Sequence, residues 1–259
     1  MDYLHKIDQN PYRDLYWNMP ERKQGVVGVV GGNSQSFRVP VSVAETLATK
    51  YPTKAVKLIL PDALKNTLPP LDGLIFLPST DSGSFADGKS LAEAINATDF
   101  SLMIGDLSKN SITAKAVGSA CQSSEKPLLI IRDSVDLLTT EVTEKTLMNE
   151  NLIIFASMAQ LQKLFRAVYY PKVLLLSQSL VQVAEALHKF TLSYPVSIIT
   201  LHNEQILVAK NGIVNVMPLE KSEYSPLTIW NGELAAKIVA VNLYNPNNFL
   251  AATTAALFA

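Results

Sequence analysis

The sequence predicts a three-layer α/β/α sandwich with a mostly parallel sheet and a C-terminal antiparallel meander. Apolar runs of strand length recur along the chain, and most of them are continuous, which is typical of strands covered on both faces. Segments in which apolar residues follow helical spacing lie between these runs. Strand and helix alternate over about the first 200 residues, which implies right-handed crossovers and helices on both faces of the sheet.

The expected strands follow the apolar runs in chain order: Val26–Val30, Ala55–Leu60, Gly73–Leu77, Phe100–Ile104, Leu128–Ile131, Leu152–Phe155, Val196–Thr200, Ile206–Ala209 and Ile213–Met217. Only His202–Gln205 and Lys210–Gly212 separate the last three runs. Gaps that short are typical of antiparallel hairpins, because a parallel crossover needs many more residues. The meander is therefore expected at the end of an otherwise parallel sheet.

Helices are predicted where the apolar spacing matches a helical period. Val41–Tyr51 and Leu174–Phe190 each present one apolar side, and both are expected to pack against the sheet. A final pair, Glu233–Leu243 and Asn248–Phe258, is interrupted at Asn245–Pro246. We find no internal repeat or linker, so the prediction is a single domain over residues 1–259, with 1–24 as an N-terminal extension packed on it.

Composition excludes several classes of protein. The chain has 259 residues, of which 48% are hydrophobic and 17% charged, and this favours a globular protein over a disordered one. Its 22 basic and 23 acidic residues give a net charge of −1, so bulk electrostatics recruits neither nucleic acid nor anionic lipid. The first residues lack the apolar core of a signal peptide, and no apolar run approaches the ~20 residues of a membrane span.

Cysteine and histidine usage argues against disulfides and zinc. Cys121 is the single cysteine, so no internal disulfide forms. The three histidines His5, His188 and His202 lie far apart in the sequence and lack zinc-ligand spacing. We therefore expect no metal site built from these residues and a cytoplasmic protein. His202 falls in a tight hairpin loop, where we expect an exposed, solvated side chain.

Glycine-rich and polar residues follow the first predicted strand. Gly31, Gly32, Asn33 and Ser34 lie between Val26–Val30 and the helix that opens near Pro40. Ligands of open α/β sheets bind outside the carboxyl ends of strands, where glycines let the backbone approach closely. A βα turn without any ligand explains the same residues about as well.

The start of the Ala-rich C-terminal helix is a second candidate. Asn231, Gly232 and Glu233 open this helix, and a helix N-terminus presents unpaired N–H groups to anions. The alternative is structural, because Asn231 is a good N-cap and Glu233 suits the first turn electrostatically.

Two further strand ends carry carboxylates. Arg132-Asp133-Ser134 follows a buried strand, and Asp133 either faces the same rim or serves as N-cap of a short helical segment over Val135–Leu138. Gly105-Asp106-Leu107-Ser108 follows another strand, where turn chemistry alone accounts for glycine and aspartate. No Ser/His/Asp, Cys/His or paired-carboxylate arrangement is evident.

Taken in order, these segments resemble the ADP- or ATP-dependent NAD(P)H-hydrate dehydratase family of the ribokinase-like fold, over about Gly25 to Ala259. The family's V-G-G-S turn is similar to Val29–Ser34, and its G-P-G-L-G turn corresponds to Ile104–Ser108. Its D-A-D-A-L-N-L-L segment resembles Ile131–Leu138, with the second Asp kept as Asp133.

The remaining family motifs are altered in this chain. The T-P-H-P-G-E segment falls on Phe155–Gln160, with Ser157 for His and Gln160 for Glu, and the nucleotide-side L-K-G falls on Leu201-His202-Asn203. The G-G-T-G-D signature falls on Ile229–Glu233, where one of three glycines survives and Glu replaces the catalytic Asp. Bare glycine N–H groups would contact phosphates, whereas Ile and Trp side chains shield that concavity.

The resemblance implies roles for individual residues. Glu233 takes the catalytic position, and the nucleotide-binding positions are Leu201, His202, Asn203, Asn231 and Gly232. The substrate-binding positions are Gly31, Gly32, Asn33, Ser34, Asp133 and Ser157. ADP or ATP, bound weakly, NAD(P)H-hydrate as the substrate and Mg²⁺ are the implied small molecules.

Three functions compete. A divergent relative that keeps the fold as a ligand-binding or structural module, with reduced or lost activity, ranks slightly above an active ADP/ATP-dependent dehydratase, and a small-molecule kinase ranks third. A homo-oligomer is also expected, partly because bacterial members of the resembled family assemble and partly because one sheet face does not fully cover the apolar C-terminal helices.

Overall fold

The computed structural model describes residues 2–9, 15, 23–69, 72–219 and 230–258. Their strands form one sheet in the order β1-β10-β9-β8-β7-β6-β5-β2-β3-β4. The strand bounds are β1 Leu4–Lys6, β2 Gln24–Gly31, β3 Thr53–Pro61, β4 Leu74–Leu77, β5 Phe100–Gly105, β6 Leu128–Ile131, β7 Leu152–Ala156, β8 Ser197–His202, β9 Gln205–Lys210 and β10 Ile213–Pro218. The strands from β2 to β8 pair in parallel, whereas β8, β9 and β10 form an antiparallel meander.

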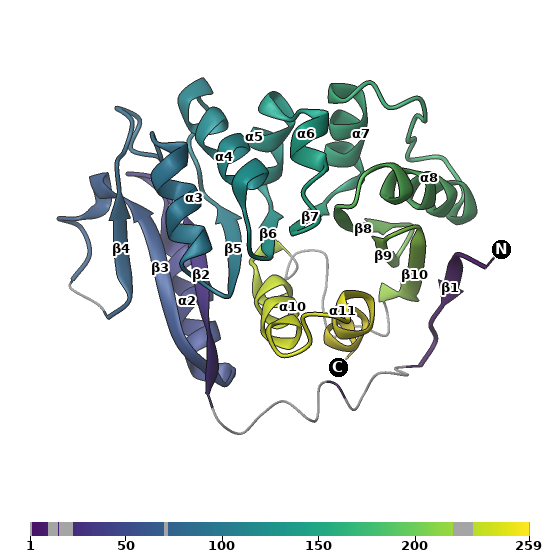
Figure 1. Cartoon of the computed structure of the whole chain (residues 1–259), viewed down its shortest axis with the longest axis horizontal. Coiled ribbons are helices and arrows are strands. Elements are labelled where there is room, and N and C mark those ends of the chain that lie inside the picture. Colours follow the sequence, from purple (N-terminus) through teal and green to yellow (C-terminus); the bar gives the residue numbers. More distant parts are fainter. Residues whose placement is uncertain (1, 10–14, 16–22, 70–71, 220–229, 259) are drawn as a thin grey trace.

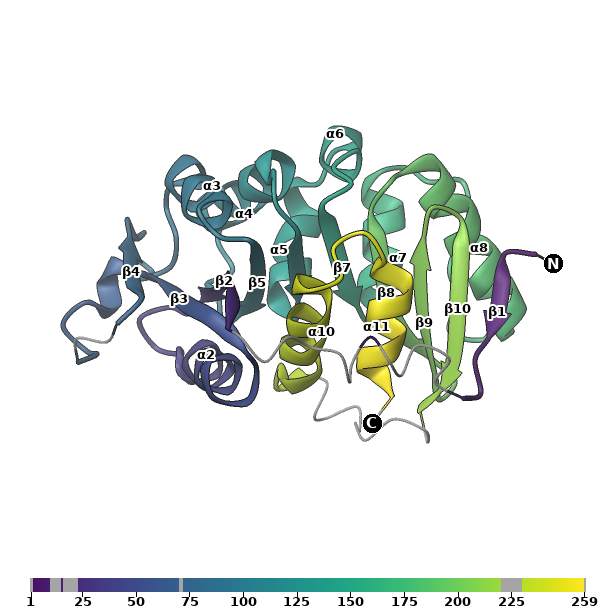
Figure 2. The same cartoon turned by 60° about the horizontal axis from the view of Figure 1, so that its bottom comes forward.

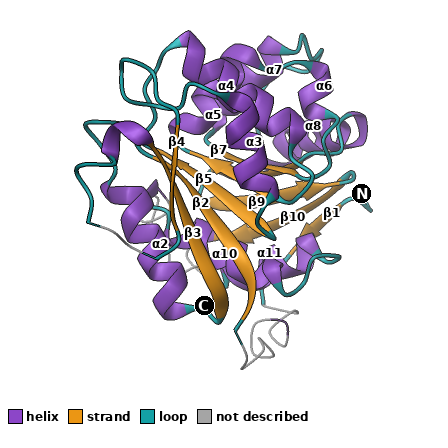
Figure 3. Cartoon of the chain, turned by 60° about the vertical axis from the view of Figure 1, so that its left-hand side comes forward, coloured by secondary structure: helices purple, strands orange, loops and turns teal. Residues whose placement is uncertain are grey.

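Helices cover both faces of this sheet (Figure 1). One face carries α3 Gly88–Asn96, α4 Ser111–Ser123, α5 Asp133–Glu141, α6 Glu144–Leu147, α7 Met158–Ala167 and α8 Leu180–Ser193. The other face carries α2 Arg38–Lys50, α10 Glu233–Leu243 and α11 Phe249–Leu257, and Figure 2 shows α10 and α11 side by side there. A short 3₁₀ helix, Asp62–Leu64, follows β3. The three-layer α/β prediction is confirmed, and Figure 3 shows the sheet between its two helix layers.

The continuous apolar runs supply two cores at once. In β6, Leu128 and Ile130 pack in the core on one face of the sheet, and Leu129 and Ile131 pack in the core on the other. Successive side chains of a strand point to opposite faces, so a strand covered on both sides needs apolar residues at every position. This is why the pattern lacks polar alternation.

The edge strand β1 was not predicted. Leu4–Lys6 pairs in parallel with β10, and the Ile7 N–H donates to the Val216 carbonyl. Most of the predicted N-terminal extension lies outside the described residues, so its packing stays a prediction. The part of the chain that the structure describes contains no helix long and apolar enough to cross a membrane.

Two helix predictions need correction. The helix expected over Leu174–Phe190 starts at Leu180, because Ser179 and Gln182 form a capping box there, and Leu176 is 67% exposed in the preceding loop. The C-terminal helices were expected to leave apolar surface uncovered. Instead α10 and α11 bury their apolar residues against the sheet and against each other. That reason for a homo-oligomer therefore fails, and the homo-oligomer remains an untested prediction.

Candidate functional site

Four glycines from three distant segments meet at the carboxyl ends of β2 and β5. The Gly32 N–H donates to the Gly105 carbonyl at 2.9 Å. A Cβ added to Gly31 would lie 2.5 Å from that same carbonyl oxygen, and one added to Gly232 would lie 2.7 Å from Ile104 Cδ1. Because β2 and β5 are neighbouring parallel strands, the fold brings these turns together with the start of α10 at one edge of the sheet.

The loop after β2 is held by its own side chains. Asn33 Oδ1 accepts the Gln35 N–H at 2.8 Å, which is an Asx turn, and Asn33 Nδ2 donates to the Asp106 carbonyl at 2.7 Å. The Ser34 N–H donates to the Gly83 carbonyl at 3.1 Å. These contacts give Asn33 and Ser34 structural roles, and their binding of substrate stays a prediction.

Asp133 ties the ends of β5 and β6 together. Its Oδ2 accepts the Leu107 N–H at 2.9 Å, so the carboxylate reaches across to the turn that follows β5. Burial raises the pKa of the Asp133 carboxyl, and the Leu107 N–H and the Arg132 charge oppose this shift. The N-cap alternative for Asp133 is wrong, because α5 begins at Asp133 itself and Arg132 occupies the N-cap position.

An ion pair that the sequence did not predict lies beside Asp133. Arg132 Nη2 is 2.8 Å from Asp106 Oδ1, and the side chains are 24% and 8% exposed. The buried Gln160 amide donates to the Arg132 carbonyl at 2.7 Å and to Asp136 Oδ2 at 3.0 Å. Charged residues directly after consecutive parallel strands are the signal that would have revealed this pair.

Ser157 caps a helix. Its Oγ accepts the Gln160 N–H at 3.3 Å, and Gln160 Oε1 accepts the Ser157 N–H at 3.0 Å, which completes a capping box at the start of α7. The two residues that replace the family's His and Glu thus stabilise each other locally. A substrate contact from Ser157 remains untested.

At the start of α10, Gly232 rather than Asn231 is the N-cap residue, with a φ of 93°. Asn231 Oδ1 accepts the Glu233 N–H at 3.1 Å. Asn231 and Glu233 are exposed, whereas Trp230 packs against the core that lies under α2 and α10. Ile229 lies outside the described residues.

The predicted nucleotide-side residues lie in the β8–β9 hairpin, separated from β5 by β7 and β6. Asn203 and Glu204 form its two-residue turn, with φ values of 47° and 57° that are typical of a type I′ turn. The expectation of an exposed His202 is wrong. The residue is 4% exposed, and its Nε2 lies 2.8 Å from the Gln178 carbonyl oxygen. The structure therefore does not bring Leu201, His202 and Asn203 into contact with the glycines at the end of β5.

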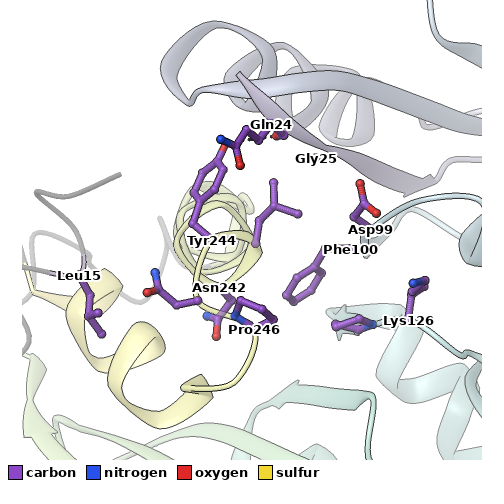
Figure 4. A pocket seen from close by; sticks show the side chains of 12 residues that line it. Leu15, Gln24, Gly25, Asp99, Phe100, Lys126, Asn242, Tyr244 and Pro246 are labelled. Carbon is purple, nitrogen blue, oxygen red and sulfur yellow. Dashed lines mark hydrogen bonds between the residues drawn. The ribbon is translucent and has the colours of Figure 1, made fainter. Parts of the chain in front are cut away.

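Two cavities flank the sheet without involving the predicted site residues. One, of about 580 Å³, lies at the amino ends of β2 and β5 (Figure 4). Phe100 stands in the middle of this hollow, with Lys126 on one side and Tyr244 directed toward Gln24 on the other. A second cavity of about 560 Å³ lies between the start of α4 and α5, beside the ion pair of Asp136 and Lys163. Both volumes are typical of small-molecule pockets.

The described residues contain no group of three His, Cys, Asp or Glu side chains that could hold a metal ion. No model of a known protein family matches the sequence, and no curated protein is significantly similar to it.

Solved structures do resemble the chain. A hypothetical protein from Streptococcus mutans is 14% identical with a TM-score of 0.66, and the match covers 97% of this chain and 88% of that one. A ribokinase-like superfamily protein from Enterococcus faecalis is 11% identical, with a TM-score of 0.65 and coverage of 98% and 85%. The ADP/ATP-dependent NAD(P)H-hydrate dehydratase from Bacillus subtilis is 11% identical, with a TM-score of 0.60 and coverage of 97% and 86%. At these identities the likeness establishes the fold alone, and the chain has the ribokinase-like fold.

Proposed function

We propose that this chain is a divergent relative of the NAD(P)H-hydrate dehydratases that keeps the fold as a ligand-binding or structural module, with nucleotide-dependent activity reduced or lost. The observation that carries this proposal is the occupied N-terminus of α10. There Asn231 Oδ1 accepts the Glu233 N–H, one of the groups that a helix would otherwise offer to an anion.

The neighbouring residues support the same reading. Gly232 is the single glycine in positions 229–233, and its φ of 93° with buried neighbours gives it a structural role. The residues at this helix start therefore do not fit the phosphates of ADP or ATP.

The β8–β9 hairpin, which carries Leu201, His202 and Asn203, also supports weak nucleotide binding. His202 stands where the resembled family has a lysine, but its ring is buried and pairs with the Gln178 carbonyl. An imidazole that contacts this backbone carbonyl is not directed at a phosphate, as the lysine of the resembled family would be. Asn203 is committed to the turn and lies 3.1 Å from the same imidazole nitrogen.

An active dehydratase is the second candidate, and one observation favours it. Glu233 is exposed in the first turn of α10, where a carboxylate of the resembled family acts in catalysis. The Bacillus subtilis dehydratase, which was co-crystallised with ATP and Mg²⁺, matches 97% of this chain in structure. Glutamate is one methylene longer than aspartate, and a catalytic group misplaced by ~1 Å can cost about 100-fold in rate.

Calorimetry with ADP and ATP in the presence of Mg²⁺ tests the proposal. Each charge-assisted hydrogen bond that a phosphate loses is worth roughly 1.5–3 kcal/mol, so losing two weakens the dissociation constant by at least ~100-fold. We expect weak or no binding to the wild type and tighter binding to Asn231→Gly and to the Trp230→Gly, Ile229→Gly double variant. Asn211→Gly is the matched control, because Asn211 lies in the β9–β10 turn with a φ of 50° that glycine adopts readily.

Turnover of NADH-hydrate by the wild type and by Glu233→Gln separates the two candidates. No turnover by either protein is the expected result. Tight binding of ADP or ATP to the wild type, together with turnover that Glu233→Gln abolishes, would establish the active dehydratase instead.

A further inference from the structure

Two carboxylates and one guanidinium share the carboxyl ends of β5 and β6. Arg132 Nη2 lies 2.8 Å from Asp106 Oδ1, and Asp133 Oδ2 accepts the Leu107 N–H at 2.9 Å. Gly105 leaves room for this arrangement, because a Cβ at that position would collide with Asp133 Oδ1. Asp106 is 9% exposed, so its charge is largely removed from water.

Each of these three side chains keeps one buried polar atom without a hydrogen-bond partner. Within the described residues the structure has seven such atoms, and three of them are Asp106 Oδ2, Asp133 Oδ1 and Arg132 Nη1. Buried polar groups in folded proteins are normally paired, and an exception points to a further partner such as water, an ion or a ligand. Three unpaired atoms in one cluster give this cluster the capacity to bind such a partner.

The backbone of the cluster is also strained. Asp106 has a φ of 57°, and Arg132 has a φ of 62° with a ψ of −137°, a region that glycine adopts far more readily than arginine. Two side chains hold this geometry, since Asn33 Nδ2 donates to the Asp106 carbonyl and Gln160 Nε2 donates to the Arg132 carbonyl, each at 2.7 Å. Strain of this kind persists where the surroundings enforce it, and it concentrates at functional sites.

We propose that Asp106 and Asp133 form a binding site for a cationic nitrogen group of a small molecule, and that the Arg132 side chain occupies this site until the ligand displaces it. The guanidinium already shows which chemistry fits, namely a positively charged group with N–H donors. Asp106 Oδ2 and Asp133 Oδ1 each have capacity for one more donor. An ammonium, amidinium or guanidinium ligand meets that requirement.

The contacts of the Arg132 side chain suit its displacement from Asp106 by a ligand. Its side chain is 24% exposed, and it meets Asp106 through one N–O pair at 2.8 Å rather than through a two-pronged fork. A free metal ion fits less well, because the described residues contain no cluster of three ligating side chains. The site does not use the start of α10, so it does not depend on the loss of nucleotide binding proposed above.

Removal of the internal cation provides the test. Arg132→Gly takes away the guanidinium and suits the positive φ, and Arg132→Met keeps an apolar stem in case the glycine variant fails to fold. Methylguanidinium chloride is the probe and Mg²⁺ is a separate arm, both measured by calorimetry at constant ionic strength. We expect both variants to bind methylguanidinium at least ~10-fold more tightly than the wild type, because no tethered group competes for the carboxylates.

Two further variants locate the binding. Asp106→Asn in the Arg132→Gly background should lose at least ~10-fold in affinity, because the partner becomes neutral. Lys163→Met is the matched control, since it removes a cation from the exposed ion pair with Asp136 and should leave wild-type affinity unchanged.

Equal affinity of the wild type and the Arg132 variants, or no binding by any of them, would overturn the proposal. Binding of Mg²⁺ without binding of methylguanidinium would overturn it in favour of a metal site. Titration of the same proteins with ADP keeps the two proposals apart. Tight ADP binding by the wild type would refute the proposed loss of nucleotide binding. It would not affect the proposal of a cation site at Asp106 and Asp133.

Discussion

The substitution Gly232→Ala tests how tightly the start of α10 packs against the ends of the neighbouring strands. The φ of Gly232 is +93°, and a Cβ there would lie 2.7 Å from both Ile104 Cδ1 and Val43 Cγ2, which are buried. For Gly232→Ala, the left-handed backbone costs about 1–2 kcal/mol and overpacking of the core costs about 1–3 kcal/mol. We therefore expect the free energy of unfolding to fall by about 2–5 kcal/mol, out of the roughly 5–15 kcal/mol of a folded protein.

Gly212→Ala is the control that isolates the packing contribution. Gly212 has a φ of +78°, and its added Cβ would lie 2.7 Å from Leu192 Cδ2, but Leu192 is 62% exposed and free to move. This variant should lose mainly the backbone contribution of about 1–2 kcal/mol, since the one other close atom, His188 Nδ1, would lie 3.3 Å away. Urea unfolding curves with matched slopes would measure both variants. If they are destabilised equally, within about 0.5 kcal/mol, the packing argument for α10 fails.

Three other expectations follow from buried or capping groups. Burial raises the pKa of the Cys121 thiol to about 12, so Ellman's reagent should not modify it in the native protein. The same reagent should label Cys121 in the urea-unfolded chain. Rapid labelling of the native protein would contradict the burial of Cys121. Burial also raises the pKa of Asp133 above 3.8, so the stability contributed by this group is present below pH 3.8 and is lost as pH rises through the raised pKa. Urea unfolding at a series of pH values should therefore show Asp133→Asn gaining stability relative to the wild type as pH rises, whereas a constant difference would refute that sign. In the same assay, Ser157→Ala should lower the free energy of unfolding by about 1 kcal/mol, because the α7 cap is lost. A decrease below about 0.3 kcal/mol would show that the capping box does not stabilise the protein.

The sequence predicts the central strands well because the physics that selects them is local. The run Phe100–Ile104 becomes β5 over Phe100–Gly105, since a strand covered by two helix layers needs apolar residues at consecutive positions. The Asn211-Gly212 turn likewise follows from residues that accept positive φ, as does Asn203 in the β8–β9 turn, whereas Glu204 has a φ of 57° that glutamate does not favour. By contrast, β1 has three residues, too few for a period, and its pairing with β10 spans most of the chain.

The candidate site was less predictable, because its decisive contacts are tertiary. His202 was expected in solvent, yet the Gln178 carbonyl, 24 residues earlier, pairs with its buried ring. Asp106 and Arg132 are 26 residues apart, and only the adjacency of β5 and β6 in the sheet places them within 2.8 Å. A turn after the strand already accounts for an aspartate at position 106. Nothing in the neighbouring sequence therefore indicates that Asp106 pairs with a distant arginine.

The charges at this edge of the sheet favour a cationic ligand over an anionic one. Asp106 and Asp133 carry carboxylates, and Arg132 supplies one opposing charge that is already paired with Asp106. An incoming phosphate would meet net negative charge in a partly buried setting, where water screens the repulsion least. The partial positive charge at the start of α10 opposes this repulsion, but Asn231 already takes one of its N–H groups. The carboxylates that would repel a phosphate at the ends of β5 and β6 would attract a nitrogen cation, so neutralising Asp106 should shift the preference of this site toward anions.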